Sequence, residues 1–385
     1  MKAGRSLLIL ASLLMAASTT TSAQDKIGEA VYLEGGVALT RDSQQLDPSQ
    51  VQTGLDIQNF DVMKTSRDGE AEVDVDTPRL PAMTIKVSPD TQFSFELSKL
   101  GAKQQASVGL VGGSIALKVA KLSSAQQLTV DLDNAVMGVR GTEFTVTSTP
   151  SDDLLVVCRT GDVVLMDENG KEIHAVPGTA VERLAGMGFT ARPFGSTDPD
   201  DFRKSWEDAR VAALKTGAFP VIQREAVAYD RLVDEFDGTY AALQEKKDIL
   251  DRWEAEEKSG SPAAGAEVEK EKAEIADLLA DLRETQFLLE RTRFRLARLE
   301  DFHKQGLGDG EIAKGVTTAA FFERFDKDRP DLEHRLAMVR FAVKLFTHRN
   351  DGHDPTMVVD LHRYYERRLT HLKRLQHKRL VNRQK

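Results

Sequence analysis

The sequence predicts an α+β protein in which an all-β domain, built as a sandwich or a short β-solenoid, is followed in series by an α-helical region. Two observations support this fold class. Between residues 26 and 192, short segments alternate apolar and polar residues and are separated by glycine, proline and asparagine turns. Beyond residue 220, apolar residues recur every seven positions over two long stretches. A period of two is typical of strands with one buried face, and a period of seven is typical of helices that pack along a seam.

The strand signals are short and regularly punctuated. Residues 70–75 read Glu-Ala-Glu-Val-Asp-Val, and residues 91–97 alternate in the same way. Asn169-Gly170 separates two apolar runs, and such a pair favours a hairpin turn because both turn residues need a positive φ. We therefore expect many short strands joined by tight turns over residues 24–192.

We expect residues 193–219 to form a linker that contains a short helix. The long helical region follows this linker. Asp198, followed by Pro199 and two further carboxylates, is typical of a helix start. Two heptad stretches then flank a break at residues 259–265, which predicts a long antiparallel coiled-coil hairpin over residues 220–304. The heptad positions are Ile222, Tyr229, Phe236, Leu243, Leu250, Val268, Ile275, Leu282, Leu289 and Leu296. The charged residues beside the tip, Glu271 among them, are expected to be solvated.

Residues 305–385 are expected to form C-terminal helices that end in a basic tail. An apolar face runs from Phe321 to Leu345. The acidic segment 325–331 does not fit a calcium-binding loop, because Pro330 stands where such a loop needs an oxygen ligand. We expect a loop there that ends where a helix begins, at Pro330. Residues 362–385 are rich in arginine and lysine and predict a basic amphipathic helix.

The first 23 residues have the order of a secretory signal peptide. Two basic residues precede an apolar run at 6–17, and small residues lead up to Ala23. The run is shorter than the ~20 residues that a spanning helix needs. We expect cleavage near Ala23 and a periplasmic or secreted mature protein. The net charge of -9 argues against a nucleic-acid partner.

The sequence predicts no catalytic, cofactor-binding or metal-binding residues. The single cysteine, Cys158, lies in an apolar run and is expected to be a small buried hydrophobe. The late histidines lack the helical spacing of a zinc-binding pair, and no phosphate-binding loop, dinucleotide fingerprint or nucleophile elbow is present. These features indicate a protein without enzymatic activity and without a cofactor.

Residues 135–146 resemble the hallmark of the FecR domain, a Gly-Val-Arg-Gly-Thr-x-Phe run that enters a strand. Ile57, Asp61 and Thr65 are similar to a second pattern of that family, and the resemblance covers about residues 26–184. Glycine in a strand usually marks a bulge or a close backbone approach, so we expect the hallmark to be structural. Its residues are Gly138, Val139, Arg140, Gly141, Thr142 and Phe144.

In the regulators that define the family, the domain lies outside the inner membrane and relays receptor occupancy to a sigma factor through a transmembrane helix. This sequence offers no such helix, so the resemblance implies a module that binds a protein or an envelope component. We expect a non-enzymatic extracytoplasmic interaction or scaffold protein in envelope signalling, with self-association through the hairpin. Two alternatives stay open: an envelope carbohydrate-binding protein or enzyme, and a membrane-surface protein attached by its basic C-terminal helix.

Overall fold

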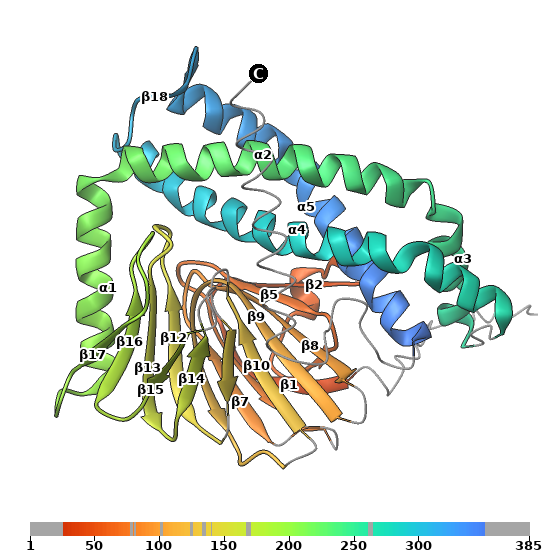
Figure 1. The fold of residues 1–385 in the computed structure, drawn as a ribbon, viewed down its shortest axis with the longest axis horizontal. Coiled ribbons are helices and arrows are strands. Elements are labelled where there is room, and N and C mark those ends of the chain that lie inside the picture. The colour runs from red at the N-terminus through yellow and green to blue at the C-terminus, as the bar shows by residue number, and fades with distance from the viewer. Residues whose placement is uncertain are drawn as a thin grey trace, which may run out of the picture.

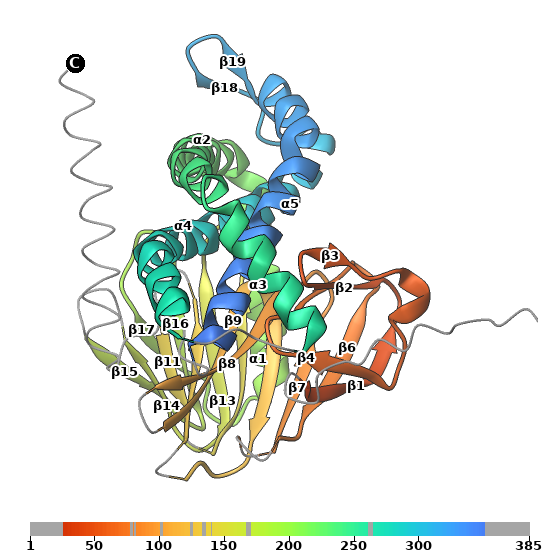
Figure 2. The same cartoon turned by 90° about the vertical axis from the view of Figure 1, so that its right-hand side faces the viewer.

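The structure is a computed structural model that describes residues 26–77, 80, 82–100, 103–123, 126–132, 136–139, 141–166, 171–260 and 265–350. It confirms a β-rich N-terminal region followed by a helical region. Two β-sheets face each other, and a layer of helices lies across one side of them (Figures 1 and 2). The predicted signal peptide and the basic tail fall outside the described residues.

The two sheets share one long strand, β9 (Lys103–Val119), which crosses from one sheet to the other. In order, the first sheet contains β4 (Leu55–Gln58), β1 (Lys26–Glu34), β6 (Glu70–Val75), β7 (Met83–Val87), the second part of β9, β12 (Glu143–Ser148), β13 (Leu154–Thr160), β16 (Thr179–Arg183) and β17 (Thr190–Pro193). In order, the second sheet contains β3 (Gln44–Gln45), β2 (Val37–Arg41), β5 (Val62–Thr65), β8 (Gln92–Leu100), the first part of β9, β10 (Gln126–Asp131), β11 (Val136–Val139), β14 (Val163–Met166) and β15 (Glu172–Ala175).

The strands bury alternate residues between the two sheets, as the period of two predicts. Ile85 and Phe144 of the first sheet meet Phe93 and Val108 of the second in one apolar cluster. The β14–β15 hairpin forms as expected, although its Asn169-Gly170 turn lies outside the described residues. Of the two predicted forms, the pair of facing sheets is a sandwich.

Residues with positive φ mark the places where the chain passes from one sheet to the other. Gly35, Gly113, Gly141, Gly161 and Gly178 all have φ between 63° and 94°. At Gly113 an added Cβ would lie 2.5 Å from the carbonyl oxygen of Asp90. Only glycine fits such a corner without strain, which explains the glycine punctuation of this half of the sequence.

The helical region contains five helices within the described residues, in addition to the one-turn helix η1 (Pro48–Gln50) of the β region. They are α1 (Pro199–Thr216), α2 (Ala218–Gln244), α3 (Lys247–Ser259), α4 (Ala266–Lys304) and α5 (Thr318–Arg349). A small hairpin of β18 (Glu311–Ala313) and β19 (Val316–Thr317) separates α4 from α5. Asp198 caps α1 as predicted, since its carboxylate accepts hydrogen bonds from two backbone amides of the first turn.

The helices bury the predicted heptad positions, but they share them among more helices than expected. Helix α2 packs antiparallel to α4, and α5 packs against α4 (Figure 1). Phe321 and Leu336 of α5 therefore enter the same apolar cluster as Phe236 and Leu289. The first heptad stretch is also broken, because α2 ends at Gln244 and α3 begins at Lys247. Leu250, beyond this break, is only partly buried.

Two further expectations about the helical half were wrong. Helix α5 continues through Pro330 instead of beginning there. This proline and Asp326, whose carbonyl group loses its intrahelical partner, are both exposed residues. Glu271 is only 7% exposed and accepts a hydrogen bond from the indole of the buried Trp253, at 2.7 Å. Its carboxylate therefore belongs to the contact between α3 and α4 instead of the solvated surface.

Candidate functional site

The helices are attached to the β region mainly through one face of α4. Arg283, Phe287, Arg291, Arg295 and Arg298 follow one another at intervals of three or four residues, so they lie along one side of the helix. We call the four arginines of this stripe the arginine face of α4. The heptad residues occupy a different side, where they pack on α2 and α5. Helix α4 is therefore buried on two sides at once.

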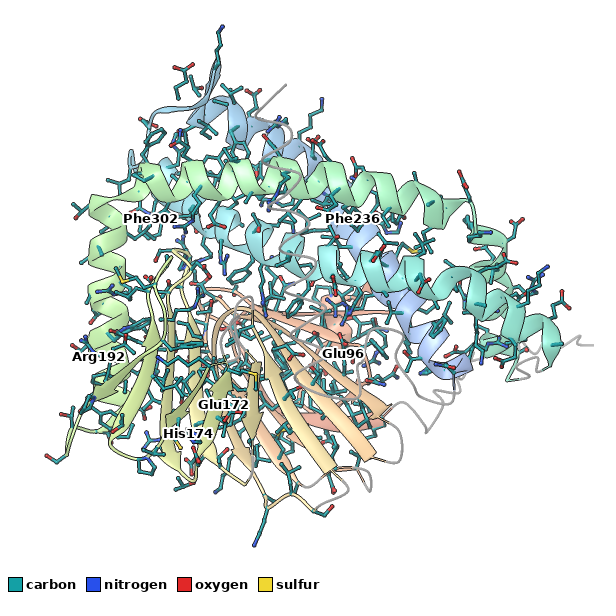
Figure 3. All side chains as sticks on the ribbon, viewed as in Figure 1. Glu96, Glu172, His174, Arg192, Phe236 and Phe302 are labelled. Atoms are coloured by element: carbon teal, nitrogen blue, oxygen red, sulfur yellow. The ribbon has the colours of Figure 1, made fainter. Side chains whose placement is uncertain are left out.

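Glu96 of β8 is the acidic centre of this contact. It pairs with Arg283 of α4 and, at 2.9 Å, with Arg340 of α5, which also pairs with Glu290 of α4 at 2.7 Å. Figure 3 shows Glu96 on the side of the strands that faces the helical layer. Burial alone would raise the pKa of Glu96, but the two guanidinium groups outweigh burial and hold that pKa below its ordinary value of 4.5. One carboxylate thus holds two helices on the second sheet.

Arg291 binds backbone rather than a carboxylate. Its guanidinium donates to the carbonyl oxygens of Leu110 at 2.9 Å and of Asp131 at 2.6 Å, and it stacks 3.7 Å from the centre of the Phe287 ring. The side chain is 1% exposed. The planar fork of arginine suits this task, because it can satisfy two carbonyl groups at the edge where β9 and β10 run side by side.

Glycines in β9 allow α4 to approach this closely. A Cβ at Gly112 would lie 2.4 Å from the Phe294 ring, and one at Gly109 would lie 3.2 Å from the Phe287 ring. The glycines of this strand are thus explained by two aromatic side chains of α4 that pack directly on the backbone. Two further arginines of the face, Arg295 and Arg298, pair with Asp152 and Asp90.

A cavity of about 310 Å³ opens beside this network, between the second sheet and helices α4 and α5. Lys64 of β5, Arg293 of α4 and Lys344 of α5 line it from three directions. Phe60, at the corner between β4 and β5, is 4% exposed and belongs to the apolar cluster of the helices instead of the β core. Ionisable groups from both regions of the protein therefore meet in one cavity.

The hallmark residues lie elsewhere, at a corner between the sheets. Gly138 and Val139 end β11 in the second sheet, Gly141 has φ 63°, and Phe144 enters the core from β12 in the first sheet. Thr142 is 1% exposed, and its hydroxyl has no hydrogen-bond partner among the described residues. Arg140 lies outside the described residues. These placements fit the structural role expected for the motif, which remains a prediction.

Alanine substitutions at the two hallmark glycines should change the free energy of unfolding by different amounts. Gly141→Ala should lower the free energy of unfolding by about 1–2 kcal/mol, because its φ is left-handed and its Cβ would lie 3.0 Å from the Cα of Lys121. Gly138→Ala should leave stability unchanged within about 0.5 kcal/mol, since nothing lies within 4 Å of its Cβ position. Urea unfolding of both variants measures the difference. Equal effects would contradict a corner role for Gly141.

The pairing of Glu96 should make the protein sensitive to acid. A carboxyl group with a lowered pKa contributes stability above its unfolded value of about 4.5, and that stability is lost as the pH falls further, toward the folded value. The wild type should therefore lose stability below about pH 4.5 more steeply than Glu96→Gln, whose amide does not titrate. Urea unfolding at pH 7, 5 and 4 tests this. A stability gap between the two proteins that stays constant over that range would show that Glu96 is not responsible.

Outside this contact, the described part of the chain contains no candidate metal centre. Among those residues, no three histidine, cysteine, aspartate or glutamate side chains are placed to hold a metal ion. His348 pairs with Glu257 at 2.8 Å, and Cys158 is fully buried, with its pKa raised to about 11 first by burial and then by Asp162. None of the described helices has both the length and the apolar character needed to cross a bilayer.

The comparison with family models agrees with the sequence resemblance. A family model described as FecR protein matches residues 61–164. Two solved chains, each described as a candidate anti-sigma factor from Parabacteroides distasonis, are similar at 14% identity, with TM-scores of 0.29 and 0.23. The matches cover 35% and 34% of this chain, and they span only 60% and 55% of those two chains. No curated protein matches. The chain carries a FecR domain, which occupies roughly a quarter of its length, from β5 into β14.

Proposed function

We propose that this protein is a non-enzymatic, extracytoplasmic interaction protein, in which a FecR domain and a helical region act as one unit in envelope signalling. The FecR match supports a signalling-related role with protein partners. The observation that carries the proposal is the attachment of α4 to the FecR domain by buried charges: Glu96 and Arg291 are 5% and 1% exposed. A partner bound to either region would meet the other in a fixed position.

The proposal assigns a task to each segment. Residues 24–192 form the recognition domain, residues 193–219 connect it to the helices, and residues 220–304 form an antiparallel hairpin that presents or spaces the domain. Residues 305–385 complete the helical region. The hairpin is also the surface through which we propose self-association, because α2 exposes Val227 at 52% of its surface. Residues 1–23 direct the chain to the periplasm, with cleavage near Ala23.

Two positions allow partner binding to be mapped in cells. His174 of β15 is half exposed on a part of the sheet remote from the helices (Figure 3). Val227 of α2 is 52% exposed. A photo-crosslinking residue at each position should capture envelope proteins if these surfaces bind partners. The matched control is Met187, which is 65% exposed in a loop. Identical capture profiles at all three positions would contradict the proposal. The proposal would also be contradicted if the purified chain turned over a substrate and one substitution abolished that activity.

Location is tested separately. The proposal expects a tagged chain to appear in the periplasmic fraction without residues 1–23. If the chain instead stays with the membranes and a high-salt wash releases it, attachment by the basic residues 362–385 would replace this proposal, since salt screens charges within ~10 Å at 0.1 M. Recovery in the cytoplasm would contradict both.

A further inference from the structure

The cavity between the second sheet and helices α4 and α5 has the form of a small-ligand site. Its volume of about 310 Å³ lies at the lower end of the range for such sites, roughly 300–1,000 Å³. Asp42, Gln45, Glu333 and His334 at its edge are exposed, whereas Arg340 and Leu336 deeper in are buried. The cavity is therefore open to solvent at one side and closed by protein at the other.

The positive and negative charges of the side chains that line the cavity do not cancel. Its lining includes four cations, Lys64, Arg293, Arg340 and Lys344, but only the carboxylates of Asp42, Glu290 and Glu333. Arg340 pairs with Glu290, Lys344 with Asp42, and Arg293 with Glu333. Lys64 is left without an ion pair to any described residue. The lining therefore carries an excess of one positive charge.

The surroundings of Lys64 disfavour its charge in the empty cavity. Its side chain reaches solvent, yet it is enclosed by the walls of the cavity; this burial is the main cause that lowers the pKa of Lys64, and the charge of Arg293 lowers it further. Arg293, a side chain only 6% exposed, lines the same cavity and pairs with Glu333 at its edge. An anion beside Lys64 would favour the charged form of this lysine.

We propose that this cavity binds a small monocarboxylate with an apolar body. The carboxylate would lie between Lys64 and Arg293, where one negative charge neutralises the excess charge of the lining. The apolar body would rest against Phe60, Leu336 and Phe341, which line the same cavity. Because Lys64 belongs to β5 and Arg293 to α4, the bound ligand would link the FecR domain to the helices. This proposal is independent of the protein partners proposed above.

The test measures binding to the full mature chain by thermal unfolding and calorimetry, with phenylacetate, butyrate and acetate as probes. Phenylacetate should raise the melting temperature, and the neutral phenylacetamide should not. Lys64→Gln should weaken phenylacetate binding at least about tenfold, since it removes a charge-assisted hydrogen bond. Lys118→Gln is the matched control, because Lys118 is an exposed strand lysine that does not line the cavity. Its affinity should equal that of the wild type.

Measurements without ligand guard against a folding artefact. The lining of the empty cavity disfavours the charge of Lys64, so Lys64→Gln should be at least as stable as the wild type at pH 7. Loss of binding would then be a local effect. The proposal is overturned if none of the three carboxylates binds the wild type at concentrations up to about 10 mM, a range in which even weak sites are detectable. Equal binding by Lys64→Gln and Lys118→Gln would overturn it as well.

Discussion

Replacing Arg340 by methionine should lower the free energy of unfolding by about 3–5 kcal/mol. The reason is that Arg340, 5% exposed, pairs with Glu96 at 2.9 Å and Glu290 at 2.7 Å. Methionine fills much of the space but leaves both buried carboxylates with one cation fewer, and removing one partner of a buried ion pair is far more costly than the pair itself is stabilising. Urea unfolding followed by circular dichroism measures the change.

A surface cation provides the matched control. Lys258 pairs with Glu254 one helical turn away on α3, and its side chain is 73% exposed. Lys258→Met removes the same kind of charge and should change stability by no more than about 0.5 kcal/mol. Adding Glu290→Gln to Arg340→Met should recover part of the loss, since it removes a carboxylate that the first change left unpaired. A loss below about 1 kcal/mol for Arg340→Met would show that the Glu96 network does not hold the helices in place.

Much of the fold could be predicted from local sequence patterns. Alternation placed Glu70–Val75 and the 163–166 run in strands, the Asp198 cap marked the start of α1, and the heptad positions identified residues that are largely buried. These signals are local, because they depend on which residues neighbour one another within one element. They say nothing about which sheet a strand joins. The sharing of β9 between two sheets, at Gly112 and Gly113, is set by contacts distant in sequence.

The candidate site was missed for a related reason. Charged residues at helical spacing are usually solvated, and the arginine face of α4 looks like such a surface in the sequence. One signal could have revealed it: Phe287 and Phe294 alternate with Arg283, Arg291 and Arg298 on a helix whose apolar heptad stripe lies elsewhere. Two large aromatic side chains on the presumed solvent side indicate a second buried face. The acids that pair with these arginines could not be identified, because Glu96 is 187 residues from Arg283 and Asp90 is 208 residues from Arg298.

Phe60→Ala should be the second most damaging change, with a loss of about 3–5 kcal/mol, the usual cost of truncating a buried aromatic side chain. Phe60 has φ 70° and its backbone amide donates to the carbonyl of Phe95 at 3.1 Å, so the corner between β4 and β5 directs this ring into the cluster of the helices. The loss should appear as weaker coupling between the two regions. Limited proteolysis should then cut near residues 193–198 before the β region unfolds.

The unusual φ of Phe60 supplies a sharper version of this test. At most sites glycine is less stable than alanine by roughly 0.5–1 kcal/mol, because it has more conformational freedom to lose. At a left-handed position alanine is strained by about 1–2 kcal/mol and glycine is not. Phe60→Gly should therefore be at least as stable as Phe60→Ala. The control is Met187→Ala, at a residue that is 65% exposed, and its stability should equal that of the wild type. If Phe60→Gly proves clearly less stable than Phe60→Ala, the corner does not hold Phe60 in this conformation. The attachment of the helices to the FecR domain would then depend on the arginine face of α4 and on Arg340.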